Sequence, residues 1–149
     1  PGQIVISGAA GNIAKSMELA KAAGASRVIT LQVSGAFHSP LMKSTIEGMT
    51  KAIESTPFKD PTLPVVANVT ALPLAKAGEV KAELINQLTN PVQWQRSIEY
   101  MIKQGVDTFI EIGPGKVLTG LARRISKDVS GFAVNTAEDI DAALAAILV

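Results

Sequence analysis

The residue with the clearest potential for chemistry is His38, the only histidine among the 149 residues. It lies in the segment VSGAFHSPLM (33–42), at the end of an apolar run and just before Pro40, which can open a helix. A histidine in this setting can act as a general base near neutral pH. A general base needs a nucleophile to activate, yet the sequence has no cysteine and no G-x-S-x-G pattern. The sequence therefore predicts half of an active site.

The neighbours of His38 bear on whether it is catalytic or is a core histidine satisfied by a nearby group. Without context, the core interpretation is the favoured one. However, Ser34, Gly35 and Ser39 are small enough for the imidazole to be approached closely, and Phe37 offers a wall for a substrate pocket. A catalytic histidine also needs a partner on its other ring nitrogen. No carboxylate lies nearby in the sequence, so a backbone carbonyl from elsewhere in the chain is a candidate partner.

Two glycine-containing turns each follow a predicted strand and precede a predicted helix. Gly8–Gly11 resembles a phosphate-binding loop but lacks both the G-x-G-x-x-G spacing and the P-loop lysine, so a plain turn is the favoured interpretation over a nucleotide-binding module. Gly113-Pro114-Gly115 follows Glu111 and is more distinctive. It is consistent either with an anion at the following helix N-terminus or with a tight strand-to-helix connection.

One predicted helix carries four basic residues, and another begins with the only tryptophan. Lys116, Arg123, Arg124 and Lys127 lie opposite an apolar face. They form either a solvated surface or a surface for an acidic partner protein. Trp94 is expected to pack in the core.

The composition narrows the class of protein. With 47% hydrophobic and 18% charged residues, 149 residues suffice for one domain with a substantial core and argue against disorder. A net charge of +1 does not predict a nucleic-acid partner. The lack of cysteine excludes disulfides and thiolate metal sites, and a single histidine argues against zinc. The sequence has no apolar run of about 18 residues, so it predicts no membrane-spanning helix.

The start of the chain and its targeting signals lead to two expectations. The sequence opens with Pro-Gly rather than Met and runs almost directly into a predicted strand, so we expect a segment of a larger protein. We also find no signal-peptide pattern and expect a cytoplasmic location.

Apolar β-branched runs alternate with segments of helical periodicity along the whole chain, which predicts an α/β fold. The sheet is expected to be mostly parallel in its later part. The predicted strands cover residues 3–7, 27–33, 65–69, 107–112 and 131–134. The predicted helices cover residues 12–23, 40–54, 79–88, 94–104 and 116–127, with a last one capped by Thr136 or Asp139 and running to the terminus. Asn12 is the expected N-cap of the first helix and Gly24 its stop signal.

Five motifs in order resemble the C-terminal half of malonyl-CoA:acyl carrier protein transacylases and of the related acyltransferase domains in fatty acid and polyketide synthases. The motifs are PGQIVISG (1–8), VSGAFHSPLM (33–42), VVANVTA (65–71), NQLTNPVQW (86–94) and EIGPGKVLTGL (111–121). The resemblance implies an α/β-hydrolase-like subdomain interrupted by a small ferredoxin-like one. Residues 1–34 would be the remaining β-α-β of the small subdomain, and residues 35–149 the C-terminal part of the large one.

The same resemblance implies ping-pong transfer of a malonyl group from coenzyme A, through a serine ester, to the phosphopantetheine thiol of acyl carrier protein. His38 would be the general base, oriented by the backbone carbonyl of Gln87. Phe37, the residue before the histidine, would select malonyl over methylmalonyl. No metal or bound cofactor is implied, since coenzyme A enters as the substrate ester, and neither nucleic acid nor a membrane is an expected partner.

The resemblance also shows what the chain lacks. The GHSxG serine, the oxyanion-hole glutamine and the arginine that holds the malonyl carboxylate belong to the N-terminal half of the family fold. We therefore expect the isolated chain to be inactive and its missing half to be a partner. The alternative is a non-catalytic fragment of the same fold that binds carrier protein or serves a structural role.

Overall fold

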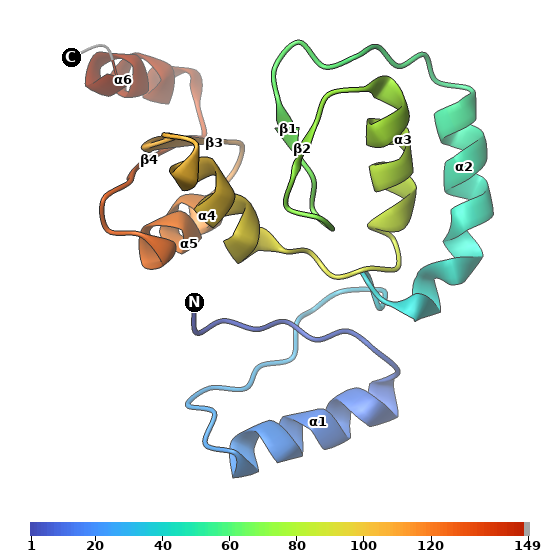
Figure 1. Cartoon of the computed structure of the whole chain (residues 1–149). Helices are drawn as coiled ribbons and strands as arrows, with labels where there is room; N and C mark the ends of the chain where they lie inside the picture. Colours follow the sequence, from blue (N-terminus) through green and yellow to red (C-terminus); the bar gives the residue numbers. More distant parts are fainter. Residues whose placement is uncertain (148–149) are drawn as a thin grey trace. The chain divides into compact units, whose positions relative to one another are not determined.

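The computed structural model describes residues 1–147, and Figure 1 shows its course. The polypeptide divides into two compact units, one formed by Gln3–Gln93 and the other by Pro1–Gly2 together with the chain from Trp94 onward. Helices and strands are mixed, which confirms the predicted α/β class. None of the helices in residues 1–147 combines the length and the apolar character needed to cross a membrane. The expected boundary between residues 34 and 35 stays a prediction.

Residues 1–39 contain one helix, α1 (Ala10–Ala22). Gly24 has a φ of 88° and its amide donates to Lys21, so the predicted stop signal is confirmed. The predicted N-cap is wrong, because the helix begins two residues before Asn12 and is preceded by Ala9, whose side chain cannot cap it. Alanines are strong helix formers, and they extend the helix past the expected start.

The strands predicted at residues 3–7 and 27–33 are not formed, because neither run belongs to a sheet within the described residues. A strand exists only when a neighbouring strand pairs with its N–H and C=O groups. The apolar side chains of both runs are exposed, with Ile4 88% and Ile29 57% accessible. These two predictions fail because β-branched composition favours a strand but does not supply the partner.

The rest of the Gln3–Gln93 unit packs two helices and a short hairpin. The segment predicted as one helix from Pro40 forms a 3-10 helix, η1 (Pro40–Thr45), that continues as α2 (Ile46–Glu54). Strand β1 (Val65–Val66) is shorter than predicted and pairs antiparallel with β2 (Pro73–Leu74), which lies between the predicted strand 65–69 and the predicted helix 79–88. Helix α3 (Ala77–Asn86) follows and lies beside α2 (Figure 1).

Asp60, in the proline-rich loop after α2, ties that loop to the start of α3. Its carboxylate accepts from the Ala77 amide at 2.8 Å and from Lys76 Nζ at 3.0 Å. The hydrogen bond from the Ala77 amide, helped by Lys76, lowers the pKa of the Asp60 carboxyl group. An acidic side chain is favourable at this end of a helix, where backbone N–H groups lack partners.

The second unit is a β-α-β arrangement between two further helices. Helix α4 (Trp94–Lys103) leads into β3 (Thr108–Ile112), and α5 (Val117–Ile125) connects it to β4 (Ser130–Val134). Strands β3 and β4 are parallel, as predicted, with Thr108 opposite Ser130 and Ile112 opposite Val134. Helix α6 (Ala137–Ile147) follows Thr136, and the Asp139 carboxylate accepts from the Asn135 and Thr136 amides.

The centre of this second unit lies where α4 and α5 pack together. Ile98 on α4 and Ala122 on α5 are each 1% exposed. Gly131 on β4 is buried against Thr119 of α5, and a Cβ atom on this glycine would lie 3.3 Å from the Thr119 side chain. Such a distance leaves little room, so a small residue at position 131 permits the close packing of α5 on the sheet.

Candidate active site

His38 lies in a tight turn just before η1. Its φ of 57° is in the left-handed region, which histidine tolerates better than most residues but which still costs energy. Ser39 holds the turn from inside, since its buried hydroxyl donates to the Ala36 carbonyl at 2.6 Å and accepts from the Leu41 amide at 3.3 Å. The turn thus leaves the histidine side chain exposed.

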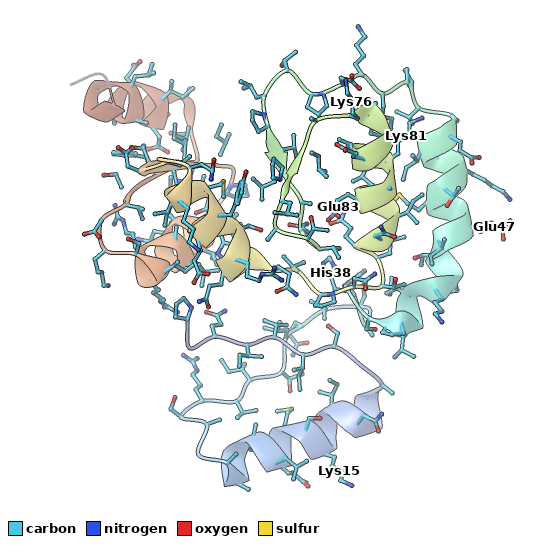
Figure 2. The ribbon with its side chains drawn as sticks, viewed as in Figure 1. Lys15, His38, Glu47, Lys76, Lys81 and Glu83 are labelled. Atoms are coloured by element: carbon cyan, nitrogen blue, oxygen red, sulfur yellow. The ribbon has the colours of Figure 1, made fainter. Side chains whose placement is uncertain are left out.

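The imidazole of His38 contacts the backbone at the far end of α3. Its Nδ1 atom lies 2.7 Å from the carbonyl oxygen of Gln87, a residue 49 positions away in the sequence. Figure 2 shows His38 close to the end of α3 from which Gln87 follows. Because a carbonyl oxygen only accepts hydrogen bonds, Nδ1 carries the proton in this contact. The neutral ring therefore keeps its lone pair on Nε2, which is the arrangement a general base needs.

The carbonyl of Gln87 is available because of where the residue lies. Gln87 is the residue directly after α3, and its own amide donates to the Glu83 carbonyl at 2.9 Å. The last carbonyls of a helix have no N–H partner in a following turn. The carbonyl of Gln87 is such a group, and it accepts from His38 instead.

The loop between β1 and β2 adds two side-chain contacts to the same end of α3. Asn68 Nδ2 donates to Gln87 Oε1 at 2.8 Å, and the Val69 amide donates to Glu83 Oε1 at 2.9 Å. Sequence reasoning missed Asn68 and Glu83. The available signal was the motif VVANVTA, in which a polar side chain follows directly after the short apolar run of a predicted strand.

Phe37, the residue expected to select the acyl group, lies beside the histidine in the chain and is 45% exposed. Its ring folds over Gly35, where a Cβ atom would lie 3.3 Å from Phe37 Cζ. The structure thus brings His38 and Gln87 into contact and keeps Phe37 in the same turn with much of its ring accessible. The catalytic and selective roles of these three residues stay predictions.

Comparison with known proteins identifies the family. The sequence profile described as "Acyl transferase domain" matches residues 1–144. The chain belongs to this acyl transferase family. The resemblance expected from the five motifs is therefore confirmed for nearly the whole length of the chain.

Named relatives of this acyl transferase chain are malonyl transferases. It is 45% identical over 144 residues to the malonyl CoA-acyl carrier protein transacylase of Bacillus subtilis (strain 168), covering 97% of this chain and 45% of that protein. The crystal structure of acyl-carrier-protein-S-malonyltransferase from Bartonella henselae superposes with a TM-score of 0.88 at 41% identity, over 94% of this chain and 45% of that one.

A second similar structure contains a carrier protein. It is described as a type II PKS acyl-carrier protein in complex with its malonyl-transacylase, and it matches with a TM-score of 0.87 at 37% identity. The match covers 92% of this chain and 44% of that one. The acyl transferase chain described here thus spans a little less than half the length of the relatives it matches.

The Gly113–Gly115 turn of the acyl transferase chain forms a tight strand-to-helix connection. Gly113 and Gly115 have φ values of 135° and 106°, a region that other residues rarely adopt. The N-terminus of α5 already receives a carboxylate of the chain itself, because Glu111 Oε2 accepts from the Thr119 amide at 2.8 Å. This hydrogen bond lowers the pKa of the Glu111 carboxyl group. Of the two interpretations left open, the tight connection is the one that the structure shows.

Two further residues singled out from the sequence, Arg123 and Trp94, take part in packing and hydrogen bonding within the second unit. Arg123 donates to the Gly131 carbonyl at 2.8 Å, so this basic residue holds α5 on β4. Trp94 lines a cavity of about 80 Å³ together with Ile98, Phe109 and Leu118, which agrees with the expected packing role. Within residues 1–147, no three His, Cys, Asp or Glu side chains group closely enough to bind a metal ion.

Proposed function

We propose that this chain supplies the general-base half of a malonyl-CoA:acyl carrier protein transacylase. The observation that carries the proposal is the 2.7 Å contact between His38 Nδ1 and the Gln87 carbonyl, which leaves Nε2 as the proton acceptor on an exposed side chain. Support comes from the relatives, which are named as transacylases of malonyl groups. The alternative of a non-catalytic fragment is not favoured by these relatives.

In this proposal His38 moves one proton in each half-reaction. Nε2 accepts the proton of a serine hydroxyl while the serine oxygen attacks the thioester carbonyl of malonyl-CoA, and the imidazolium then protonates the departing sulfur of coenzyme A. Next, Nε2 takes the proton of the phosphopantetheine thiol, whose sulfur attacks the malonyl-serine ester, and returns it to the serine oxygen. The Gln87 carbonyl keeps the ring in the required tautomer and favours the imidazolium formed in each step.

The serine, the oxyanion-hole glutamine and the malonyl-binding arginine are proposed to lie in the part of the family fold that this chain does not cover. The apolar exposure of the chain supports such a partner. In the first unit Ile4 is 88% accessible and Ile6 is also exposed, and in the second unit Ile112 is 84% accessible and Ile110 is also exposed. Apolar surface in this amount is expected to be covered by the remaining part of the fold.

Acyl carrier protein is proposed as the second substrate, and malonyl as the acyl group, in fatty acid or polyketide synthesis in the cytoplasm. The carrier complex of the similar type II PKS transacylase supports the first choice. The aromatic ring of Phe37 supports the second, since a bulky group next to the base leaves less room for the methyl branch of methylmalonyl.

The test replaces the base in a complemented enzyme, meaning this chain joined to the remaining part of the Bacillus subtilis relative. His38→Ala is expected to lower kcat/KM by roughly 10²- to 10⁴-fold, the usual contribution of a positioned base. Gln87→Ala is expected to cost much less, because the carbonyl that contacts His38 belongs to the backbone. The 149-residue chain alone, incubated with labelled malonyl-CoA, should acquire no label. Full activity of the His38→Ala enzyme, or a stable malonyl ester on this chain, would show that the proposal is wrong.

A further inference from the structure

We propose that Asn68 is a positioning residue for His38 and that it acts through the side chain of Gln87. The inference rests on the proposed function, because it concerns the orientation of the proposed base. Within residues 1–147, Asn68 makes no hydrogen bond to His38 itself. What connects them is Gln87, which uses its backbone oxygen for His38 Nδ1 at 2.7 Å and its side-chain oxygen for Asn68 Nδ2 at 2.8 Å.

The carbonyl of Gln87 needs such a support because of its place in the chain. Gln87 follows the last residue of α3, and the chain from there to α4 has no regular structure beyond turns. Helix ends fray, and a carbonyl at such an end has no neighbouring turn to fix its direction. The hydrogen bond from Asn68 fixes the side chain of the same residue, and this restricts the rotation of the Gln87 backbone.

Asn68 can serve as an anchor only if its own loop is rigid, and two further contacts hold that loop. The Asn68 carbonyl accepts from the Gln93 amide at 2.7 Å, and the next amide, that of Val69, donates to Glu83 Oε1 at 2.9 Å. Glu83 and Gln87 are four residues apart, so they lie on the same face of α3. The loop is therefore attached to α3 at two points one helical turn apart, and Figure 2 shows Glu83 on this helix.

The conformation of the loop adds to its rigidity. The Ala67 amide donates to the Leu72 carbonyl at 2.9 Å, and the Ala71 amide donates to the Ala67 carbonyl at 3.1 Å. Ala67 and Ala71 are 2% and 4% exposed, so both ends of the turn are buried. Ala71 adopts a φ of 59°, a strained value for alanine that persists only where the surroundings determine the backbone.

The test uses the fact that the chain has a single histidine, so its ring nitrogens give unambiguous NMR signals. In the 149-residue chain at alkaline pH, the neutral imidazole of His38 should carry its proton on Nδ1. Asn68→Ala and Gln87→Ala should each move the tautomer equilibrium toward Nε2–H. In the complemented enzyme, each should lower kcat/KM by about 2- to 12-fold, the equivalent of one neutral hydrogen bond.

A double-mutant cycle separates this route from a general loss of order. If Asn68 acts through the Gln87 side chain, adding Asn68→Ala to Gln87→Ala should change neither the tautomer nor kcat/KM any further. Asn90→Ala is the matched control, because Asn90 Nδ2 donates to the Asn86 carbonyl at 2.8 Å near the same helix end and, within residues 1–147, makes no hydrogen bond to Gln87. This control should match the unmodified protein in both measurements.

Two results would overturn the inference. One is an Asn68→Ala protein whose His38 tautomer and kcat/KM equal those of Asn90→Ala. The other is a fall in kcat/KM on Asn68→Ala that is the same in the unmodified enzyme and in the Gln87→Ala enzyme. If Asn68→Ala does not fold, Gln87→Met removes the same acceptor with little change in side-chain length, and its tautomer decides the matter. Failure of the proposed function is distinguishable, because it shows as full activity of His38→Ala, whereas the tautomer is measured without any turnover.

Discussion

His38 and Glu111 are titratable residues whose side chains each form a hydrogen bond within the chain. They differ in whether the side chain keeps an exposed atom that could react. His38 uses Nδ1 for the Gln87 carbonyl and keeps Nε2 on an exposed ring. Glu111 uses one oxygen twice, accepting from the Thr119 amide at 2.8 Å and from the Thr119 hydroxyl at 2.9 Å. Thr119 is 7% exposed, so both hydrogen bonds tie this carboxylate to a buried residue of α5.

The difference teaches how to tell a reactive group from a structural one in this fold. The pKa of Glu111 is lowered by the Thr119 amide, and shifted carboxylates often mark functional sites. Here the cause of the shift is the bond that joins β3 to α5, which is a structural role. Changes near Glu111 should therefore alter stability, whereas changes near His38 should alter turnover.

The largest stability effect expected around Glu111 comes from Gly131→Val. The added side chain would meet Thr119, which lies 3.3 Å from an ideal Cβ at position 131, and such overpacking typically costs about 1–3 kcal/mol. The measurement is the free energy of unfolding of the chain from urea titration. Gly120→Ala on α5, next to Thr119, is the control, because a Cβ there meets nothing within 4 Å. It should raise stability by about 0.5–1 kcal/mol. Equal stability of the Gly131→Val and unmodified proteins would contradict close packing at this point.

On the His38 side, Phe37→Ser should change selectivity and leave stability nearly unchanged. Phe37 is 45% exposed, so removal of its ring leaves little buried cavity. One methyl group in a pocket is worth roughly 1–3 kcal/mol, and we expect methylmalonyl transfer to rise about tenfold relative to malonyl transfer. Competition between the two coenzyme A esters in the complemented enzyme measures this ratio. If the ratio stayed the same, acyl selection would belong to the part of the fold outside this chain.

Much of the second unit could be predicted from sequence, because its signals are local. The sequence predicts helix α4 at residues 94–104, the structure has it at Trp94–Lys103, and Gly105 follows with a φ of 91°. Strands β3 and β4 were expected within one residue of their observed starts, and their parallel pairing follows from the helix between them. The two paired strands and the helix that connects them all lie within about thirty residues of the sequence.

The predictions that fail, and the contacts that are not predicted, depend on segments far apart in the sequence. The runs at residues 3–7 and 27–33 have strand composition, but pairing is a property of two segments, and neither run pairs within the described residues. The contact between His38 and Gln87 could not be derived from residue types either, since every residue has a carbonyl oxygen. It was expected only through the family resemblance. The sequence does not predict the contact of Asn68 with Gln87, because that contact depends on a loop and a helix end meeting in space.

The smallest expected effect is the pH dependence of stability that comes from Glu111 and from Asp60, a carboxylate in the other unit that also accepts from a backbone amide. Backbone amides, that of Thr119 for Glu111 and that of Ala77 for Asp60, lower the pKa of each carboxyl group in the folded protein. A carboxylate with a lowered folded pKa adds stability that is fully present above its unfolded pKa, near 4.5 for Glu111 and 3.8 for Asp60. That stability is lost as the pH falls through the lowered folded value.

Glu111→Gln and Asp60→Asn should therefore be less stable than the unmodified chain at neutral pH, and the deficit should shrink on acidification below the unfolded pKa. The Asp60→Asn deficit should begin to close at a lower pH than that of Glu111→Gln, because the unfolded pKa of aspartate is lower. Urea titrations at a series of pH values measure both curves. A deficit that stays constant with pH would mean that the charged form of the carboxylate is not what Thr119 or Ala77 binds. In the complemented enzyme, neither variant should change kcat/KM for the folded fraction, because neither carboxylate contacts His38, Gln87 or Phe37 through any hydrogen bond in the described residues.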